Sequence, residues 1–130
     1  MSKPKCRILC VDDHHDTAEM LLLLLSEEDY EVTTAATISE ASQLATRDHF
    51  DLYVLDKRLP DGSGTYLCGI LNALTPNVPC IFYTGDAYEV HRQEAMAAGA
   101  TEFVVKPNID DLISTVHKLL REHECASESA

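Results

Sequence analysis

The hydrophobic positions of this 130-residue chain fall into two alternating patterns. Short, dense apolar runs are typical of strands that are buried on both faces of a sheet. Between them lie longer stretches in which apolar residues recur every three or four positions, as on one face of an amphipathic helix. The dense runs predict five strands, over residues 6–11, 30–35, 52–55, 78–83 and 102–105.

A predicted helix follows each predicted strand. Thr37 and Glu40 form a capping box at the start of the second helix, and Gly99 is well placed to end the fourth. The fourth helix, which Asp86 can cap, has the poorest apolar stripe, whereas the fifth, after Asn108, has the cleanest periodicity. Regular alternation of strand and helix predicts an α/β fold with a parallel sheet. We therefore predict a flavodoxin-like, doubly wound (βα)5 domain with strand order 2-1-3-4-5.

Polar residues follow four of the five predicted strands. Asp12 and Asp13 follow the first strand, Asp56 the third, Thr84 the fourth and Lys106 the fifth, while the second ends in alanines. The carboxyl ends of parallel strands lie at one edge of a sheet, where open α/β sheets bind their ligands. We therefore expect these side chains to converge on one pocket.

Three carboxylates in one pocket repel one another, and Lys106 alone does not balance them. A divalent cation is the natural complement, and ligands that are all oxygen favour Mg²⁺. With the cation and Lys106 in place, the local charge is near zero and an incoming anion is tolerated. Such a site suits phosphoryl chemistry, in which Asp56 acts as the nucleophile and Thr84 donates a hydrogen bond.

The chain carries 22 acidic and 10 basic residues and a formal net charge of −12. Nucleic-acid binding requires a basic surface, so this charge argues against direct contact with DNA or RNA. It argues equally against an anionic membrane surface. The longest apolar run, Met20 to Leu25, is too short to span a bilayer, and Met1 to Lys5 is not followed by the apolar core of a signal peptide. We therefore predict a cytoplasmic protein.

The five cysteines do not suggest a disulfide framework, because their number is odd. Cys6, Cys10 and Cys80 lie in predicted strands, and Cys68 lies in a predicted helix. We expect them to be buried, reduced thiols.

The motifs taken together resemble the receiver domain of two-component response regulators. Each motif alone is a weak signal, but their order and spacing are specific, and they span about residues 5 to 121. Gly85, where many members of the family have alanine, is a mild departure. The matching motifs are Asp12-Asp13, Asp56 to Pro60 with Gly64, Thr84-Gly85 and Lys106-Pro107.

The resemblance implies a phosphorylation site and a metal site. Asp56 would accept a phosphoryl group from a histidine kinase or a histidine phosphotransfer protein, and the aspartyl phosphate would hydrolyse slowly. Mg²⁺ would be held by the carboxylates of Asp12, Asp13 and Asp56 and by the backbone carbonyl of Arg58.

The resemblance also implies a switch. Thr84 and Lys106 would bind the phosphoryl group, Phe103 would occupy the switch-aromatic position, and the peptide bond between Lys106 and Pro107 would be cis. A downstream protein would bind the face made by the fourth helix, the fifth strand and the fifth helix, which includes Tyr88.

Two further predictions concern the limits of the domain and the phosphate lifetime. The receiver domain would occupy residues 1–122, and residues 123–130 would form a polar tail. Arg58 and Asp86 each lie two residues after a site residue. An ion pair between them would overhang the site and shield the aspartyl phosphate from water.

Two other functions are compatible with these residue types. A phosphatase of the haloacid-dehalogenase type also uses Asp, Mg²⁺, Thr and Lys, but it needs a second acid where this chain has Arg58. A receiver-like scaffold that is never phosphorylated is the other alternative, and the complete acidic set argues against it. His14 and His15 raise the further alternative of a transition-metal site. Adjacent histidines rarely bind one ion, so we prefer surface or capping roles for both.

Overall fold

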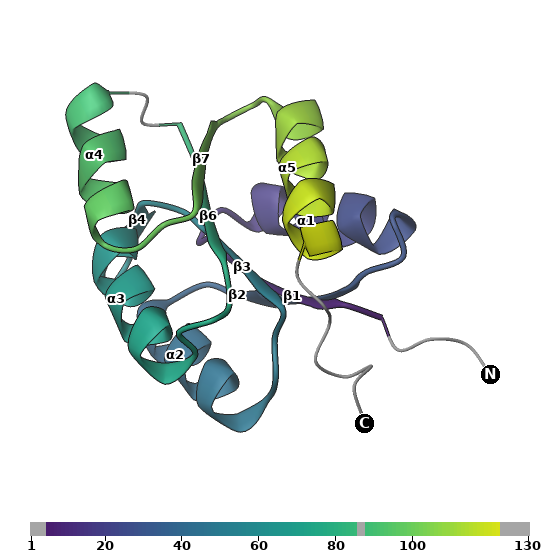
Figure 1. The fold of residues 1–130 in the computed structure, drawn as a ribbon, viewed down its shortest axis with the longest axis horizontal. Helices are drawn as coiled ribbons and strands as arrows, with labels where there is room; N and C mark the ends of the chain where they lie inside the picture. Colours follow the sequence, from purple (N-terminus) through teal and green to yellow (C-terminus); the bar gives the residue numbers. More distant parts are fainter. Residues whose placement is uncertain (1–4, 86–87, 123–130) are drawn as a thin grey trace.

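The computed structural model describes residues 5–85 and 88–122, and its centre is a parallel sheet of five strands (Figure 1). The strand order is β2-β1-β3-β6-β7. In chain order these are the five predicted strands, so the predicted order 2-1-3-4-5 is confirmed. The strands are β1 (Arg7–Val11), β2 (Glu31–Ala35), β3 (Leu52–Leu55), β6 (Cys80–Thr84) and β7 (Glu102–Val105).

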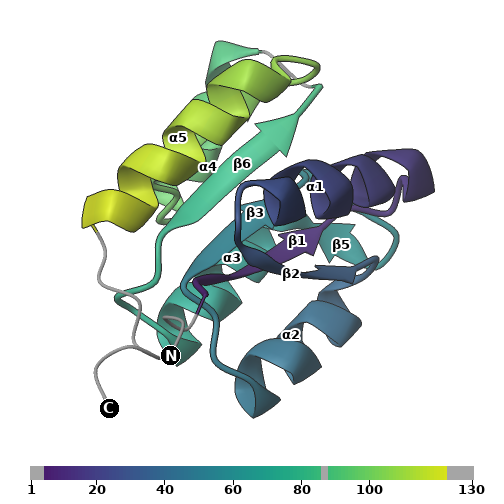
Figure 2. The same ribbon diagram turned by 90° about the vertical axis from the view of Figure 1, so that its right-hand side faces the viewer.

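Five helices cover the two faces of this sheet in the part of the chain that is described. Buried residues of α1 (His15–Glu27) and α5 (Ile109–Glu122) pack in one apolar cluster with one face of the strands. Those of α2 (Ile38–Arg47), α3 (Gly64–Leu74) and α4 (Glu89–Ala97) pack in a second cluster with the other face. Figure 2 shows α2 and α3 on the side of the sheet opposite α1. The doubly wound α/β prediction is therefore confirmed.

The central strand β3 explains why Asp56 has a fixed position. All four residues of β3 are buried. Leu52 and Val54 pack with the α1–α5 cluster, whereas Tyr53 and Leu55 pack with the α2–α3–α4 cluster. Because successive side chains of a strand point to opposite faces, both core layers hold β3 in register. The residue that follows it is therefore presented at the carboxyl edge of the sheet.

The short segment after Asp56 forms a β-hairpin. Strand β4 (Arg58–Leu59) pairs with β5 (Gly62–Ser63) in an antiparallel ladder. Asp61, in the turn of this hairpin, accepts hydrogen bonds from the backbone N–H groups of Ile38 and Ser39 at 2.8 and 3.1 Å. The hairpin therefore connects the edge of the site to the first turn of α2.

Most of the predicted helix ends are confirmed. The Oγ1 of Thr37 accepts a hydrogen bond from the backbone N–H of Glu40 at 3.1 Å, which is one half of a capping box, while the Oε1 of Glu40 accepts from the backbone N–H of Ala36 at 2.8 Å. Gly99 ends α4 in the left-handed region, with a φ of 110°. Helix α4 itself begins only at Glu89, and the cap predicted at Asp86 lies outside the described residues.

The prediction of reduced cysteines is confirmed for three residues and wrong for one. Cys10, Cys68 and Cys80 are buried free thiols. Cys6 is disulfide-bonded. Among the helices of the described residues, none combines the length and the apolar character that crossing a bilayer would demand.

Candidate functional site

Asp56 lies at the centre of a polar site at the carboxyl edge of the sheet. Its residue is only 5% exposed, and its backbone N–H donates to the carbonyl of Val11 at 2.9 Å. One carboxylate oxygen, Oδ1, accepts from the backbone N–H of Lys57 at 2.7 Å. The other, Oδ2, accepts from the Nζ of Lys106 at 3.3 Å. Both oxygens of a nearly buried carboxylate are therefore satisfied, as burial of a charge requires.

Gly64 allows the backbone to approach Asp56 closely. Its backbone N–H donates to the carbonyl of Lys57 at 2.6 Å. A Cβ atom at this position would overlap the carbonyl oxygen of Asp56. Ser63 precedes it and caps α3, because its Oγ accepts from the backbone N–H of Tyr66 at 3.1 Å. The start of α3 can therefore lie this close to the end of β3 only because glycine has no side chain.

The acidic pair Asp12-Asp13 follows β1 and faces Asp56, as predicted. Asp12 is 4% exposed, and its backbone N–H donates to the carbonyl of Ala35 at 3.0 Å. Asp13 is more exposed. One ligand atom each from Asp12, Asp13, Asp56 and His14 lies within 4.8 Å of the other three. The structure therefore brings the three predicted carboxylates together.

Lys106 supplies the nearest fixed cation, from the end of β7. Its Nζ lies 2.8 Å from the Oδ2 of Asp12 and 3.3 Å from the Oδ2 of Asp56. Burial alone would lower the pKa of Lys106, but the hydrogen bond to Asp12 and the charge of Asp56 outweigh it and raise that pKa. The peptide bond between Lys106 and Pro107 is cis, as predicted. Lys106 is therefore a stable ammonium that bridges two carboxylates.

His14 has the predicted surface position, since its side chain is 66% exposed, but it also faces this site. Its Nδ1 is 2.9 Å from the Oδ1 of Asp12, and although His14 occupies the N-cap position of α1, its ring makes no capping hydrogen bond. The hydrogen bond to Asp12, followed by the charge of that carboxylate, raises the pKa of His14. His15 does have the predicted surface role, because its Nε2 lies 3.4 Å from Glu19 and its side chain is 83% exposed.

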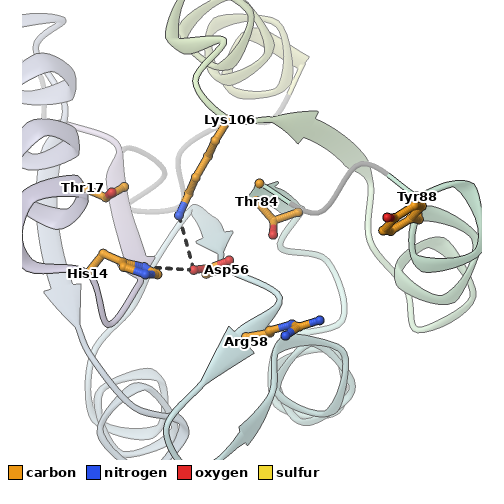
Figure 3. Close-up of a pocket in the computed structure, with 8 residues that line it drawn as sticks. His14, Thr17, Asp56, Arg58, Thr84, Tyr88 and Lys106 are labelled. Carbon is orange, nitrogen blue, oxygen red and sulfur yellow. Dashed lines mark hydrogen bonds and ion pairs between the residues drawn. The ribbon is translucent and has the colours of Figure 1, made fainter.

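A pocket of about 850 Å³ opens over these groups. Figure 3 shows Lys106 and His14 pointing toward Asp56, with Thr84 near them and Tyr88 farther away. Thr84 is 3% exposed, and its carbonyl accepts from the backbone N–H of Lys106 at 2.8 Å. Thr17, in the first turn of α1, also faces this pocket. The pocket is lined by His14, Thr17, Asp56, Arg58, Thr84, Gly85, Tyr88 and Lys106.

Phe103 does not line the pocket but packs behind it. It pairs in register with Phe82, and the two rings stack with their centroids 6.4 Å apart. Because Val105 pairs with Thr84 two residues further on, Phe103 and Thr84 share one face of the sheet. The predicted shielding ion pair of Arg58 and Asp86 stays a prediction, since Asp86 lies outside the described residues.

The donor set suits a divalent cation. Three carboxylates and one ammonium sum to −3 + 1 = −2 when His14 is neutral. Two positive charges would therefore balance the site. Carboxylate oxygens are the ligands that Mg²⁺ prefers, and the residues present fit that ion.

Comparison with known proteins identifies the class of this domain. The model of the response regulator receiver domain family matches residues 8–117. The chain therefore belongs to this family. Response regulator protein PilR of Pseudomonas aeruginosa is 33% identical over 123 residues, which are 92% of this chain and 27% of PilR. Probable transcriptional regulatory protein TcrX of Mycobacterium tuberculosis is 34% identical over 115 residues, which are 88% of this chain and 49% of TcrX.

Solved structures agree with this assignment. A CheY-like response regulator receiver domain protein from Methanospirillum hungatei is 33% identical, with a TM-score of 0.87, and the match covers 92% of this chain and 96% of that one. Response regulator TrrA of Thermotoga maritima, solved in complex with Mg²⁺-BeF, is 36% identical, with a TM-score of 0.80. The match covers 88% of this chain and 99% of that one. The chain spans about a quarter of PilR and about half of TcrX.

Proposed function

We propose that this domain is a phosphorylation-switched signalling module whose phosphoacceptor is Asp56. The observation that carries the proposal is the position of this carboxylate. It is nearly buried at the end of the central strand, it is bonded to Lys106, and it opens onto a pocket that also holds Thr84. A structural carboxylate in the core would not need a pocket of this size beside it.

Mg²⁺ would be held by Asp12, Asp13, Asp56 and the backbone carbonyl of Arg58. When bound, the ion supplies positive charge that neutralises the oxygens of the transferring phosphoryl group. The support in this chain is the set of three converging carboxylates. The relative TrrA was solved with Mg²⁺-BeF, and we extend that chemistry to this site by similarity.

The side chains of this chain have separate tasks in the transfer. An oxygen of Asp56 attacks phosphorus, the P–N bond to the donor histidine breaks, and the phosphoryl group passes to Asp56. The ammonium of Lys106 pairs with a phosphoryl oxygen, and the hydroxyl of Thr84 donates a hydrogen bond to another. Lys106 already lies 3.3 Å from Asp56, so this charge needs little reorganisation.

The donor would be a histidine kinase or a histidine phosphotransfer protein, and a downstream protein would bind the face of α4, β7 and α5. The relatives that this chain matches are named regulators, and the chain covers only part of each. We assign the receiver to residues 1–122 and an extension to residues 123–130. The net charge of −12 supports the absence of direct nucleic-acid contact by this domain. A cytoplasmic location stays a prediction.

The structure offers less support for the phosphatase alternative. A haloacid-dehalogenase enzyme needs an acid two residues after its nucleophile, whereas Arg58 occupies that position and lines the pocket. No carboxylate among the described pocket residues takes its place, since Asp56 is the only acid there. We further propose that the aspartyl phosphate hydrolyses slowly, as a switch requires.

One experiment separates the three functions. The protein is incubated with a small phosphodonor and Mg²⁺, and its intact mass is measured over time. The proposal predicts one phosphoryl group per chain, bound as an acid-labile acyl phosphate, which decays slowly after the donor is removed. Release of many phosphates per chain with no adduct would favour the phosphatase. No adduct and no turnover would favour the scaffold.

A further inference from the structure

The strongest feature that the proposed function leaves unused is the ring of His14. The distances of its Nδ1 to three acidic side chains are 2.9 Å to Asp12, 3.4 Å to Asp13 and 3.6 Å to Asp56. No other histidine of the described residues belongs to this group of ligand atoms. The cluster therefore offers one nitrogen donor among its oxygens.

These separations are those expected of atoms that share one metal ion. Two donors bound at about 2.1 Å lie roughly 3.0 Å apart at a right angle and roughly 3.4 Å apart at the tetrahedral angle. The three distances from the Nδ1 of His14 fall at or near these values. The ring thus lies where it can bind the same ion as the carboxylates with little movement.

Lys106 and His14 face the same oxygen of Asp56 but different oxygens of Asp12. The Nζ of Lys106 bonds to the Oδ2 of Asp12, whereas His14 faces the Oδ1 of the same carboxylate. The backbone N–H of His14 also donates to that Oδ1, at 2.9 Å, and this local turn directs the ring back toward the acidic pair. Two hydrogen bonds to Asp12, one from its backbone and one at its ring, therefore orient His14.

We propose that His14 is a ligand of the cation site and shifts its preference toward transition-metal ions. Imidazole nitrogen favours ions such as Co²⁺, Ni²⁺ and Zn²⁺, whereas a site of oxygens alone favours Mg²⁺. The ligating Nδ1 uses its lone pair, and the ring proton then resides on Nε2. This inference rests on the cation site of the proposed function and adds a selectivity that the three carboxylates do not provide.

The test compares Co²⁺ and Mg²⁺ binding in the native protein and in His14→Gln, by calorimetric titration at constant pH. His15→Gln is the matched control, because His15 is the adjacent histidine and faces Glu19 instead of the acidic pair. Loss of groups that only support a metal ligand costs about 10- to 100-fold in affinity. We therefore expect His14→Gln to lower the ratio of Co²⁺ to Mg²⁺ affinity by about tenfold or more, and His15→Gln to leave it unchanged.

A spectroscopic readout shows the ligand itself. Pulsed electron paramagnetic resonance with one equivalent of Cu²⁺ detects coupling to an imidazole nitrogen. The coupling should be present in the native protein and in His15→Gln, and absent in His14→Gln. An unchanged affinity ratio, or coupling retained in His14→Gln, overturns the role of His14 alone. Failure of the native protein to bind any of these ions overturns the cation site and this inference with it.

Discussion

Asp13 is the member of the acidic set whose removal tests the cation site most cleanly. Asp12 and Asp56 both bond to Lys106, whereas no bond joins Asp13 to that lysine. Asp13 is also more exposed than either. Replacing it should therefore disturb the rest of the site least.

We expect Asp13→Ala to fold with nearly native stability and to bind Mg²⁺ much more weakly, by about tenfold or more. Phosphorylation should then require a correspondingly higher Mg²⁺ concentration. Calorimetric titration with Mg²⁺ and urea unfolding measure the two effects. Native Mg²⁺ affinity in Asp13→Ala would remove Asp13 from the set of ligands.

The residues of the site differ in how far they can be predicted from the sequence. Asp12, Asp13, Asp56 and Lys106 were predictable because each follows a buried strand, and parallel strands end at one edge. His14 was not, because the direction of its ring is set by a local turn in which its N–H bonds to Asp12. Neither strand nor helix periodicity reports such a turn.

At the scale of elements, the start of α3 depends on a contact that only glycine permits. Gly64 lies against the carbonyl of Asp56, and a Cβ would overlap it. Gly69 of the same helix has no heavy atom within 4 Å of the position that its Cβ would occupy. Substitution of Gly69 is therefore a matched control for substitution of Gly64.

We expect Gly64→Ala to lower the free energy of unfolding by roughly 1–3 kcal/mol, as overpacking does, and to displace the loop that holds Asp56. Gly69→Ala should instead raise it by about 0.5–1 kcal/mol, because alanine favours helix. Urea unfolding measures both. Equal effects of the two substitutions would contradict the account of α3.

The start of α2 depends on a residue from another element. Asp61 accepts from the N–H groups of Ile38 and Ser39. The hydrogen bond from Ile38 lowers the pKa of Asp61 below its ordinary 3.8. The capping box of Thr37 was predictable because it is local. The contribution of Asp61 was not, because it comes from 23 residues away in the chain.

Because its folded-state pKa is lowered, Asp61 stabilises the fold fully at pH values well above 3.8, and this contribution is lost as the pH falls through the lower folded-state value. We expect Asp61→Ala to be less stable than the native protein at neutral pH, and the difference to shrink at about pH 3. Urea unfolding at both pH values tests this. Comparing the two proteins cancels the titration of the other carboxylates. A difference that is the same at both pH values would contradict a role for the charge.

The whole molecule must carry the signal from the site to a partner. A phosphoryl group on Asp56 adds about −1.5 to −2 charges and new acceptor oxygens, which should draw Thr84 toward it. Phe103 packs on the same face behind Thr84 and can move into space that the threonine leaves. Helix α4 has Ala95 as its single buried residue, so few contacts hold it in place. It should be the element that shifts most readily.

We expect a phosphoryl mimic with Mg²⁺ to change amide hydrogen exchange in α4, β7 and the start of α5. The Asp56→Asn protein, treated identically, should show no such change, because it lacks the carboxylate that the mimic requires. Changes confined to the loops around Asp56, with these three elements silent, would reject the two-state switch.

Locating the phosphoryl group shows whether Asp56 is the phosphoacceptor. After treatment with a phosphodonor and Mg²⁺, borohydride reduces an aspartyl phosphate to homoserine, which peptide mass spectrometry locates. We expect homoserine at position 56 alone, and none in Asp56→Asn. Homoserine at another carboxylate, or phosphorylation retained in Asp56→Asn, would contradict this role of Asp56.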